Sequence, residues 1–302
     1  MKKALLITNL NARTVSQRLK QVIVKALSAD LDLEVADTRH RQHATELARQ
    51  AADRDFDLVI SFGGDGTMNE ALNGLVGTGT ALTVLPGGMA NVLCRTLGVP
   101  IDIVEATGLL LNLIRSPKVR RMHVGRTDDR YFLMSCGVGV DAATVRRTEA
   151  NPQLKRRYRD WYFLYAALQT SFSEYRGRKP NITMTADDVC EEVLIAIVSN
   201  LPEFTYFKNL PIRVTPDATI EGGLDVFAMK RFPMHYIPRL LWGVFKSGAH
   251  VRYSESIYVR DLGSASFVSS GEPFPIQVDG EYIGERTDLK VELVEEGIGI
   301  LA

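Results

Sequence analysis

The apolar positions in the first 115 residues follow two alternating patterns. Short apolar runs are typical of β-strands, and the segments between them carry apolar residues at helical spacing. Because strands separated by single helices pair in parallel through right-handed crossovers, this alternation predicts an open parallel α/β sheet. Strands are predicted at 2–9, 31–38, 56–62 and 81–88, and helices at 14–27, 43–52, 68–75, 90–97 and 104–116.

The pattern changes beyond residue 118, where the segments are short, β-rich and bounded by turn residues. Such segments predict an antiparallel sandwich or barrel, interrupted here by helical stretches at 152–176 and 233–248. We therefore expect an N-terminal open parallel α/β domain of residues 1–120 and a C-terminal antiparallel β-sandwich of residues 121–285 that meet at a cleft. Residues 286–302 are expected to return to the first domain. The further strands are predicted at 119–127, 130–140, 179–188, 191–200, 211–218, 222–230, 256–261, 264–270 and 274–283.

Composition narrows the classes of function. The 302 residues are 45% hydrophobic and 24% charged, which is ordinary for soluble globular proteins. Lysine plus arginine equals aspartate plus glutamate at 36 each, which disfavours nucleic acid as the main partner. The three scattered cysteines suggest a reducing compartment and no metal cluster. The first apolar run is too short for a signal peptide, and no run approaches the ~18 residues of a membrane span, so we expect a cytoplasmic protein.

The segment SFGGDGTMNEAL, residues 61–72, follows a predicted strand directly. Ligands bind open α/β sheets at the carboxyl ends of the strands, and bare backbone N–H groups at a helix start favour an anion. Asp65 lies between Gly64 and Gly66, where an acid would repel phosphate unless Mg²⁺ bridged them. Thr67 can cap the helix or bond a phosphate. The alternative is that Asp65 is a simple helix cap.

Several segments resemble the diacylglycerol kinase catalytic-domain family, the group of the soluble bacterial lipid kinases and the sphingosine and ceramide kinases. GGDGTMNEALNGL at 63–75 is similar to the nucleotide-binding segment of that family, and LPGGMANVLCRTLGVP at 85–100 to its second glycine segment. Four further segments of this chain resemble the family's later segments in the same order, namely GVGVDAATV, VSNLPEF, TPDATIEGGLDVFAM and PIQVDGEYI. The resemblance covers nearly the whole chain. GGDGT alone is also shared with NAD kinases and phosphofructokinases.

The resemblance implies an ATP- and Mg²⁺-dependent lipid kinase, a phosphotransferase with an alcohol group as acceptor. It implies that the ATP site lies along the first loop, the end of the second strand and the two glycine segments. The residues so predicted are Asn9, Asn11, Arg13, Thr38, Gly63, Gly64, Asp65, Gly66, Thr67, Met68, Asn69, Gly88 and Asn91. Asp65 is the predicted Mg²⁺ ligand in this site, and Glu221 could hold a second, structural Mg²⁺.

The tripeptide Asp279-Gly280-Glu281 supplies the predicted catalytic carboxylates, together with Asp65. Asp279 and Glu281 stand two apart in a strand-like stretch, so we expect them to point to one side. Paired carboxylates suit general-base work, and the resemblance assigns the proton acceptor to this tripeptide. We place Glu281 first and Asp279 second. The alternative is a hairpin turn with surface acids.

The sequence also departs from the family pattern. The first loop lacks the usual proline and glycine, and Met89 and Val92 stand where relatives carry threonine and aspartate. The 219–225 loop is one residue shorter. Two rival functions therefore stay open: an enzyme like NAD kinase, and a non-catalytic regulator that binds a nucleotide or lipid on the same fold. The sequence names neither the lipid nor the oligomeric state.

The stretch 155–162 mixes basic residues with Tyr158, Trp161 and Tyr162. Interfacial aromatics beside basic residues suit an anionic membrane surface, which would bring the enzyme to a lipid substrate on the inner face of the membrane. The alternative is an ordinary amphipathic helix packed on the sandwich. His40 and His43 have an H-x-x-H spacing that we attribute to a solvated helix start.

Overall fold

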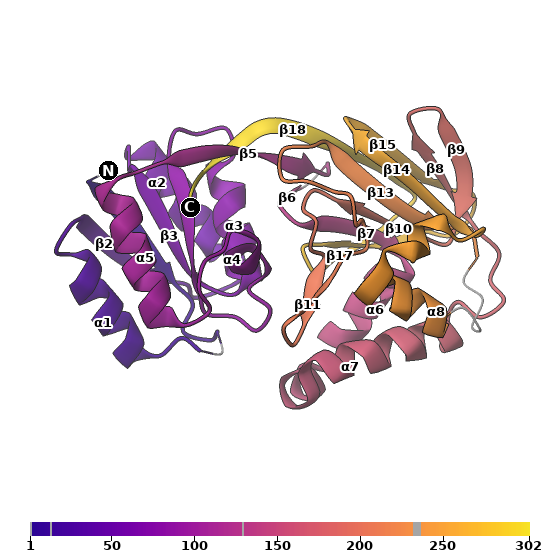
Figure 1. Ribbon diagram of the computed structural model, residues 1–302, viewed down its shortest axis with the longest axis horizontal. Helices are drawn as coiled ribbons and strands as arrows, with labels where there is room; N and C mark the ends of the chain where they lie inside the picture. Colours follow the sequence, from indigo (N-terminus) through magenta and orange to yellow (C-terminus); the bar gives the residue numbers. More distant parts are fainter. Residues whose placement is uncertain (1, 13, 129, 232–236) are drawn as a thin grey trace. The chain divides into compact units, whose positions relative to one another are not determined.

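A computed structural model describes residues 2–12, 14–128, 130–231 and 237–302, and it leaves the side chains of residues 156, 159 and 160 undescribed. The chain divides into two compact units. Unit 1 is Met1–Val124 with Val294–Ala302, and unit 2 is Gly125–Leu293. Figure 1 draws unit 1 in indigo and violet with the yellow C-terminal end of the chain, and unit 2 in magenta to orange. Arg13 of the predicted nucleotide site lies outside the described residues.

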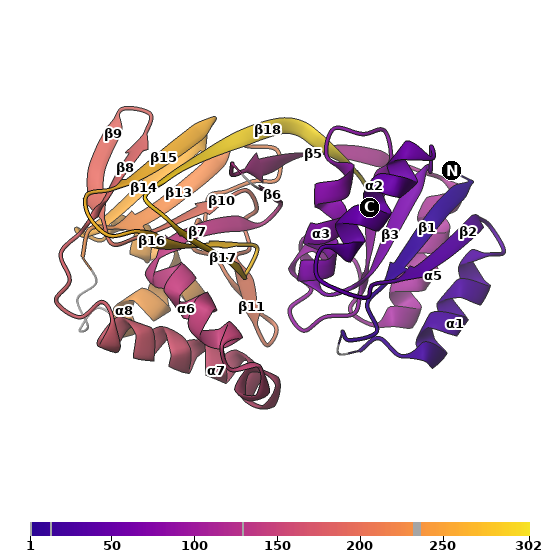
Figure 2. The ribbon, with the colours of Figure 1, turned by 180° about the vertical axis from the view of Figure 1, so that it is seen from behind.

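Unit 1 contains the predicted parallel sheet, with strand order β2-β1-β3-β4. Every residue of β3 and β4 is buried, as expected for central strands covered on both faces. Helices cover both faces, as Figures 1 and 2 show from opposite sides. The strands are β1 (Lys3–Thr8), β2 (Asp32–Asp37), β3 (Leu58–Gly63) and β4 (Ala81–Pro86), and the helices are α1 (Gln17–Leu27), α2 (His43–Asp53), α3 (Asp65–Leu75), α4 (Val92–Thr96) and α5 (Ile103–Arg115).

Strand β18 (Asp288–Leu301) contributes to both units. Near its end it pairs in parallel with β4, where Ile300 lies opposite Leu82. Its first half pairs antiparallel with β15 in unit 2, from Asp288 to Glu292. Strand β5 (Val119–Arg126) also pairs with β18 and with the short β6 (Tyr131–Phe132).

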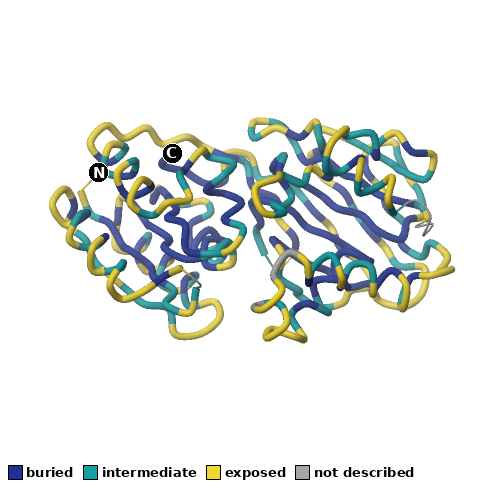
Figure 3. Tube along the Cα trace, turned by 60° about the horizontal axis from the view of Figure 1, so that its bottom comes forward, coloured by how far each residue is buried: buried dark blue, intermediate teal, exposed yellow. Residues whose placement is uncertain are grey.

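The described residues of unit 2 form two large antiparallel sheets and a small two-stranded one, which confirms the predicted fold class of an open α/β part and an antiparallel β part. One sheet has the order β14-β13-β10-β7-β16-β17, and the other contains β18-β15-β8-β9. Figure 3 shows the buried strands of each unit in dark blue. The strands are β7 (Ser135–Gly139), β8 (Ile182–Ala186), β9 (Val189–Val193), β10 (Ile195–Ser199), β13 (Leu224–Met229), β14 (Ser256–Leu262), β15 (Ser264–Ser269), β16 (Phe274–Val278) and β17 (Glu281–Arg286).

Strand β10 shows how the six-stranded sheet is packed. Ala196 and Val198 lie in the core between the two sheets, whereas Ile195 and Ile197 lie in a second apolar cluster on the opposite face. This alternation is the period of two that a strand imposes. The second face is covered by helical segments, namely α6 (Val140–Glu149), α7 (Pro152–Ser173), α8 (Ile237–Trp242), the π-helix η2 (Gly243–Ser247) and the 3₁₀-helix η3 (Ala249–Arg252).

Several segments differ from the predicted elements, and the predicted strand 191–200 is divided between β9 and β10. Helix α6, which lies between β7 and α7 in the sequence, was not predicted. Of the predicted strand 211–218, only residues 211–212 are in a strand. They belong to β12 (Leu210–Ile212), which forms a small two-stranded sheet with β11 (Thr205–Phe207). The predicted helix 233–248 is α8 followed by a π-helical turn, and its residues 233–236 lie outside the described residues.

Candidate functional site

The two glycine loops of unit 1 interlock at the carboxyl ends of β3 and β4. The N–H of Gly87 donates to the carbonyl of Gly63 at 2.8 Å. A Cβ added to Gly88 would lie 2.6 Å from the Cα of Gly64, a distance that real Cβ atoms do not show. The loops can approach this closely only because neither residue has a side chain. The glycines predicted from the sequence therefore have a structural role in addition to any contact with phosphate.

Asp65 joins the same two loops. It is the first residue of α3, and its Oδ1 accepts the N–H of Val92 at 2.7 Å, so it caps α4 rather than its own helix. Burial and then the Asp65 charge raise the pKa of the nearby Cys94 thiol to about 12. The role of Asp65 as a Mg²⁺ ligand stays a prediction.

The start of α3 can receive an anion. Its N-cap is Gly64, and in the described part of the chain no side chain caps this helix end. The first N–H groups of an α-helix have no partner within the helix and carry the positive end of its dipole. A Cβ added to the exposed Gly66 would meet nothing within 4 Å, so open space lies beside the first turn. This geometry fits a phosphate group.

The first loop is tied to α3 by side-chain amides. Asn9 Nδ2 donates to the hydroxyl of Thr67 at 3.0 Å, and Asn9 Oδ1 accepts the N–H of Asn11 at the same distance. Thr38 follows β2, and its N–H donates to the carbonyl of Thr8 at 2.9 Å. The structure thus brings Asn9, Asn11, Thr38 and Thr67 to the strand ends of unit 1, as the sequence predicted for a nucleotide site.

Three other predicted contacts are buried within unit 1. Met68 and Asn69 are 3% and 0% exposed, and the N–H of Met68 already donates to the carbonyl of Gly64. Asn91 is 5% exposed, and its amide bridges the N–H and the carbonyl of Gly88. The Asn91 side chain thus holds the second glycine loop in shape, and all three side chains are buried away from solvent.

Lys20 is a residue of this region that sequence reasoning missed. Its ammonium group lies 2.6 Å from the carboxylate of Asp37 at the end of β2, and its side chain is 15% exposed. Burial of the Asp37 carboxylate acts to raise its pKa, but the hydrogen bonds from Lys20 and Thr8 outweigh this effect and lower the pKa. The sequence signal was weak, because Lys20 is one of two lysines on an amphipathic helix.

In unit 2, Asp279 and Gly280 form the turn between β16 and β17. Val278 pairs with Glu281 across the hairpin, and the turn residues have φ of +47° and +78°. Two positive φ angles in a two-residue loop are typical of a type I′ turn. The expectation that Asp279 and Glu281 share one side of a strand was therefore wrong, because the chain reverses between them.

The alternative prediction, a hairpin turn with acids on the surface, does not describe Asp279 either. It is 9% exposed, and its carboxylate accepts three backbone N–H groups. Oδ1 accepts from Met134 and Ser135 at 2.9 Å each, and Oδ2 accepts from Leu133 at 3.1 Å. Both oxygens are occupied by donors from residues 133–135, around the start of β7, which leaves this carboxylate poorly placed to take a proton from a substrate.

Glu281 is more accessible. Its carboxylate is 2.7 Å from the guanidinium of Arg130, and the two side chains are 22% and 18% exposed. An arginine at this distance fixes the orientation of the carboxylate. Of the two carboxylates in the tripeptide, Glu281 has the position of a group that can face a substrate.

A buried hydrogen-bond network holds the turn between β16 and β17 in place. The side chain of Gln277 accepts the N–H of Gly280 and donates to Asp141 at the start of α6, both at 2.8 Å. A Cβ at Gly137 would lie 1.9 Å from the Asp141 carboxylate, so the network needs a glycine in β7. Burial raises the pKa of Asp141 to about 6, and the hydrogen bond from Gln277 opposes this shift.

Glu221, the other predicted metal ligand, is exposed. In the described chain it belongs to no group of three His, Cys, Asp or Glu side chains close enough to share an ion. The neighbouring Asp225 is engaged elsewhere, since it accepts from the hydroxyl of Tyr258 at 2.5 Å and from the N–H of Asp261 at 3.0 Å. The geometry offers no support for a structural Mg²⁺ at Glu221.

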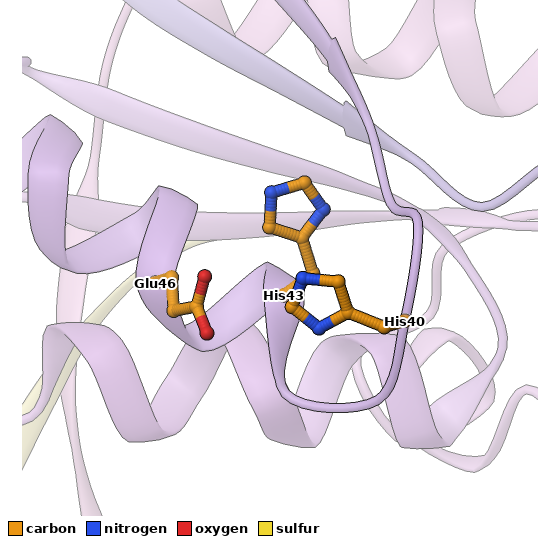
Figure 4. A group of neighbouring side chains, drawn as sticks. All are labelled: His40, His43 and Glu46. Carbon is orange, nitrogen blue, oxygen red and sulfur yellow. The ribbon is translucent and has the colours of Figure 1, made fainter.

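His40, His43 and Glu46 do form such a group, with ligand atoms within 4.8 Å of one another (Figure 4). The Nδ1 of His40 donates to the carbonyl of Arg41, which leaves its Nε2 as an acceptor. The Nδ1 of His43 instead accepts the N–H of Arg39 at 3.0 Å, so the proton of a neutral His43 is on Nε2. A metal ion would have to displace that proton or that bond, so the cluster is not prepared for one.

Among the residues that the structure describes, no helix combines the length and the apolar character needed to cross a membrane.

Comparison with known proteins gives consistent matches. The diacylglycerol kinase catalytic domain matches residues 3–127. A diacylglycerol kinase from Bacillus subtilis (strain 168) is 27% identical over 290 residues, which cover 94% of this chain and 91% of that protein. One from Staphylococcus carnosus (strain TM300) is 24% identical over 273 residues, which cover 88% of this chain and 84% of that protein.

Solved structures match the fold over its whole length. The crystal structure of a diacylglycerol kinase from Bacillus anthracis str. Sterne has a TM-score of 0.72 at 23% identity and covers 99% of this chain and 96% of that chain. A further crystal structure from the same organism has a TM-score of 0.78 at 24% identity and covers 99% and 95%. At these identities the structural match establishes the fold alone.

Proposed function

Through residues 3–127 the chain belongs to the diacylglycerol kinase catalytic-domain family, and on that premise we propose that it is an ATP-dependent kinase acting on a lipid hydroxyl group. The acceptor is diacylglycerol or a related lipid alcohol. The observation that carries the proposal is the interlocked pair of glycine loops at the carboxyl ends of β3 and β4, with the uncapped start of α3 beside them. Backbone N–H groups at a helix start are suited to phosphate oxygens.

The nucleotide side of the proposal rests on unit 1. The first turn of α3, from Gly64 to Thr67, binds phosphate oxygens of ATP, and Asn9 fixes the Thr67 hydroxyl. Asp65 is the proposed ligand of Mg²⁺, which would neutralise phosphate charge in phosphoryl transfer. Its Oδ1 already caps α4, and a carboxylate can serve an N–H and a cation through different lone pairs.

The acceptor side rests on unit 2. The hydroxyl oxygen of the lipid attacks the γ-phosphorus, the bond to the β,γ-bridging oxygen breaks, and ADP leaves. The hydroxyl proton passes to a carboxylate. We assign this role to Glu281 rather than to Asp279, because both oxygens of Asp279 accept backbone N–H groups. The ion pair with Arg130 orients Glu281, which suits a reaction that depends mainly on positioning and electrostatics.

The rival that the geometry keeps open is a non-catalytic regulator. Asp65 and Asn91 both make bonds that hold the loops together, so their presence does not by itself require catalysis. Turnover separates the two functions, because a regulator binds ATP without consuming it.

The test is incubation of the purified protein with Mg²⁺, labelled ATP and a total lipid extract, followed by mass spectrometry of the lipids. We expect a lipid product heavier by one phosphoryl group, and we expect Glu281→Gln to lose it. A protein that binds ATP but leaves every lipid unchanged would refute the kinase. With NAD supplied in a parallel incubation, a labelled dinucleotide product in place of a labelled lipid would identify an enzyme like NAD kinase.

A further inference from the structure

The carboxyl ends of three neighbouring strands in unit 1 lie level with one another. Thr8, at the end of β1, pairs with Asp37 of β2 on one side and with Phe62 of β3 on the other. Because adjacent strands are about 4.8 Å apart, Asp37 lies roughly 10 Å from Phe62, which directly precedes the glycines of the proposed phosphate site. The ribose and the first phosphates of a nucleotide can cover that span.

The strand order directs a nucleotide across this row. Strands β2 and β3 flank β1, so the order β2-β1-β3-β4 reverses at β1 (Figure 2). Open α/β sheets bind ligands at such a reversal, outside the carboxyl ends of the strands. On the other side of the proposed phosphate site, Gly88 of the loop after β4 packs directly against Gly64. A nucleotide whose phosphates lie at the start of α3 therefore extends over β1 toward β2.

Two consecutive residues connect the two ends of the row. The hydroxyl of Thr8 donates to Oδ1 of Asp37, and the amide of Asn9 donates to the hydroxyl of Thr67 at 3.0 Å. Thr8 is fully buried. The end of β1 thus holds the Asp37 carboxylate in a fixed position relative to the first turn of α3.

Asp37 keeps one carboxylate oxygen available. Among the described residues, the hydroxyl of Thr8 and the ammonium group of Lys20 both donate to Oδ1, and no donor reaches Oδ2. The pKa of Asp37 is lowered, so this carboxylate is charged at neutral pH, and its side chain is 38% exposed. A charged carboxylate oxygen can accept more than one hydrogen bond, and such bonds are stronger than neutral ones.

We propose that Asp37 selects a ribonucleotide, because its Oδ2 accepts the 2′- and 3′-hydroxyl groups of the ribose. Lys20 is a positioning residue that holds the carboxylate in this orientation. The proposal rests on the proposed function for its ligand, since it takes the phosphates of ATP to lie at the start of α3. A nucleotide that lacks a hydroxyl leaves a charged acceptor without its partner, and sites built to bond a hydroxyl reject such an analogue strongly.

The test is isothermal titration calorimetry of the purified full chain, without lipid. The probes are ADP, 2′-deoxy-ADP and 3′-deoxy-ADP, each with Mg²⁺. A hydrogen bond to a charged group changes a binding constant by roughly ten- to a hundredfold, so the parent should bind ADP at least about tenfold more tightly than either analogue. Asp37→Ala should bind all three with Kd values within about threefold of one another.

Matched variants separate the ribose contact from the loss of any acid on β2. The control is Glu34→Ala, which removes an exposed carboxylate that pairs with Arg54 nearer the start of the same strand. It should leave the preference for ADP within about twofold of the parent. Lys20→Met should lower the preference at least about threefold, and Lys20→Arg, which keeps a cation beside Asp37, should restore most of it. Circular dichroism shows whether each variant is folded.

Inorganic tripolyphosphate separates positioning by Lys20 from a direct bond to phosphate, because it carries no ribose. Its Kd should be the same for Lys20→Met and the parent. Weaker tripolyphosphate binding by Lys20→Met would make Lys20 a phosphate ligand and would overturn its positioning role.

A parent that binds ADP and both deoxy analogues equally, or an Asp37→Ala variant that keeps the preference, would overturn the ribose contact. Lipid phosphorylation tests the proposed function separately. Equal kcat/KM values for ATP and 2′-deoxy-ATP would overturn the ribose contact and leave the kinase intact. A preference for ADP that depends on Asp37, with no lipid product formed, would support the ribose contact and refute the kinase.

Discussion

Replacing Asp279 with asparagine distinguishes the structural carboxylate of the Asp279-Gly280-Glu281 turn from Glu281, the carboxylate that we propose as the base. Asparagine keeps the shape of the side chain and tolerates the left-handed backbone that Asp279 adopts at a φ of +47°. The substitution therefore removes one charge and one acceptor and leaves the turn geometry intact. Its effect reports what the carboxylate does.

The magnitude follows from the three N–H groups that the carboxylate accepts. An asparagine Oδ1 can still accept from Met134 and Ser135, but its NH₂ would face the N–H of Leu133. A hydrogen bond to a charged group contributes roughly 1.5–3 kcal/mol and a neutral one roughly 0.5–1.5 kcal/mol. One bond lost and two weakened give a loss of about 3 kcal/mol in the free energy of unfolding. For a protein of this size that corresponds to a fall in Tm of roughly 6–12 °C.

The assay is thermal unfolding by circular dichroism together with kcat measured at a temperature where each variant is folded. The matched variant is Glu281→Gln, whose ion pair with Arg130 is partly exposed and is worth about 1 kcal/mol or less. We expect Asp279→Asn to lose stability and to keep kcat within about tenfold, and Glu281→Gln to lose kcat by ~10²–10⁴-fold at nearly unchanged Tm. The opposite pattern would refute our assignment of the two carboxylates.

Three further substitutions test the remaining assignments. The Cβ introduced by Gly66→Ala meets no protein atom within 4 Å, and alanine improves helix propensity by about 1 kcal/mol, so the variant should keep its Tm. If phosphate binds beside Gly66, the KM for ATP should rise about tenfold. An unchanged KM would contradict the phosphate site. Asp65→Asn keeps an acceptor for Val92, so it should lower Mg²⁺-dependent kcat by about 10²-fold without changing Tm, and normal turnover would leave Asp65 as a cap. Burial raises the pKa of Asp141 from 3.8 to about 6, although the hydrogen bond from Gln277 acts to lower it. The folded state therefore binds the carboxyl proton of Asp141 more tightly than the unfolded state does, and stability falls as the pH rises from about 4 to 6. Asp141→Asn should therefore be more stable than the parent by roughly 3 kcal/mol in urea at pH 7.5 and equal to it below pH 4, and an equal gain at both would contradict the shift.

The parallel strands and the glycine loops could be predicted because their signals are local. Strands β3 and β4 are continuous apolar runs, and the glycines follow them directly. Helix α6 gave no such signal. Its buried residues include Asp141, Thr144 and Thr148, which are polar in sequence and enclosed only by the tertiary fold, beside small apolar residues such as Ala142 and Ala143. A hydrophobic pattern cannot show a face of this kind.

The sequence predicted which residues belong to the candidate site better than it predicted how they are arranged. Residues 63–64 and 87–88 are distant in the chain, and only the folded sheet shows that they pack on each other. The DG signal of a hairpin turn was available at Asp279, but the alternation of a strand was applied there instead. The pairing of Arg130 with Glu281 spans 151 positions, and no local pattern indicates it.

The most direct measurement of the central claim is the transfer of phosphate from γ-labelled ATP to diacylglycerol in mixed micelles, with Mg²⁺ present. We predict labelled lipid in amounts equal to the ADP formed, at a rate that Glu281→Gln lowers by at least ~10²-fold. ATP that binds but is not consumed, with diacylglycerol and with every other lipid alcohol supplied, would contradict the account.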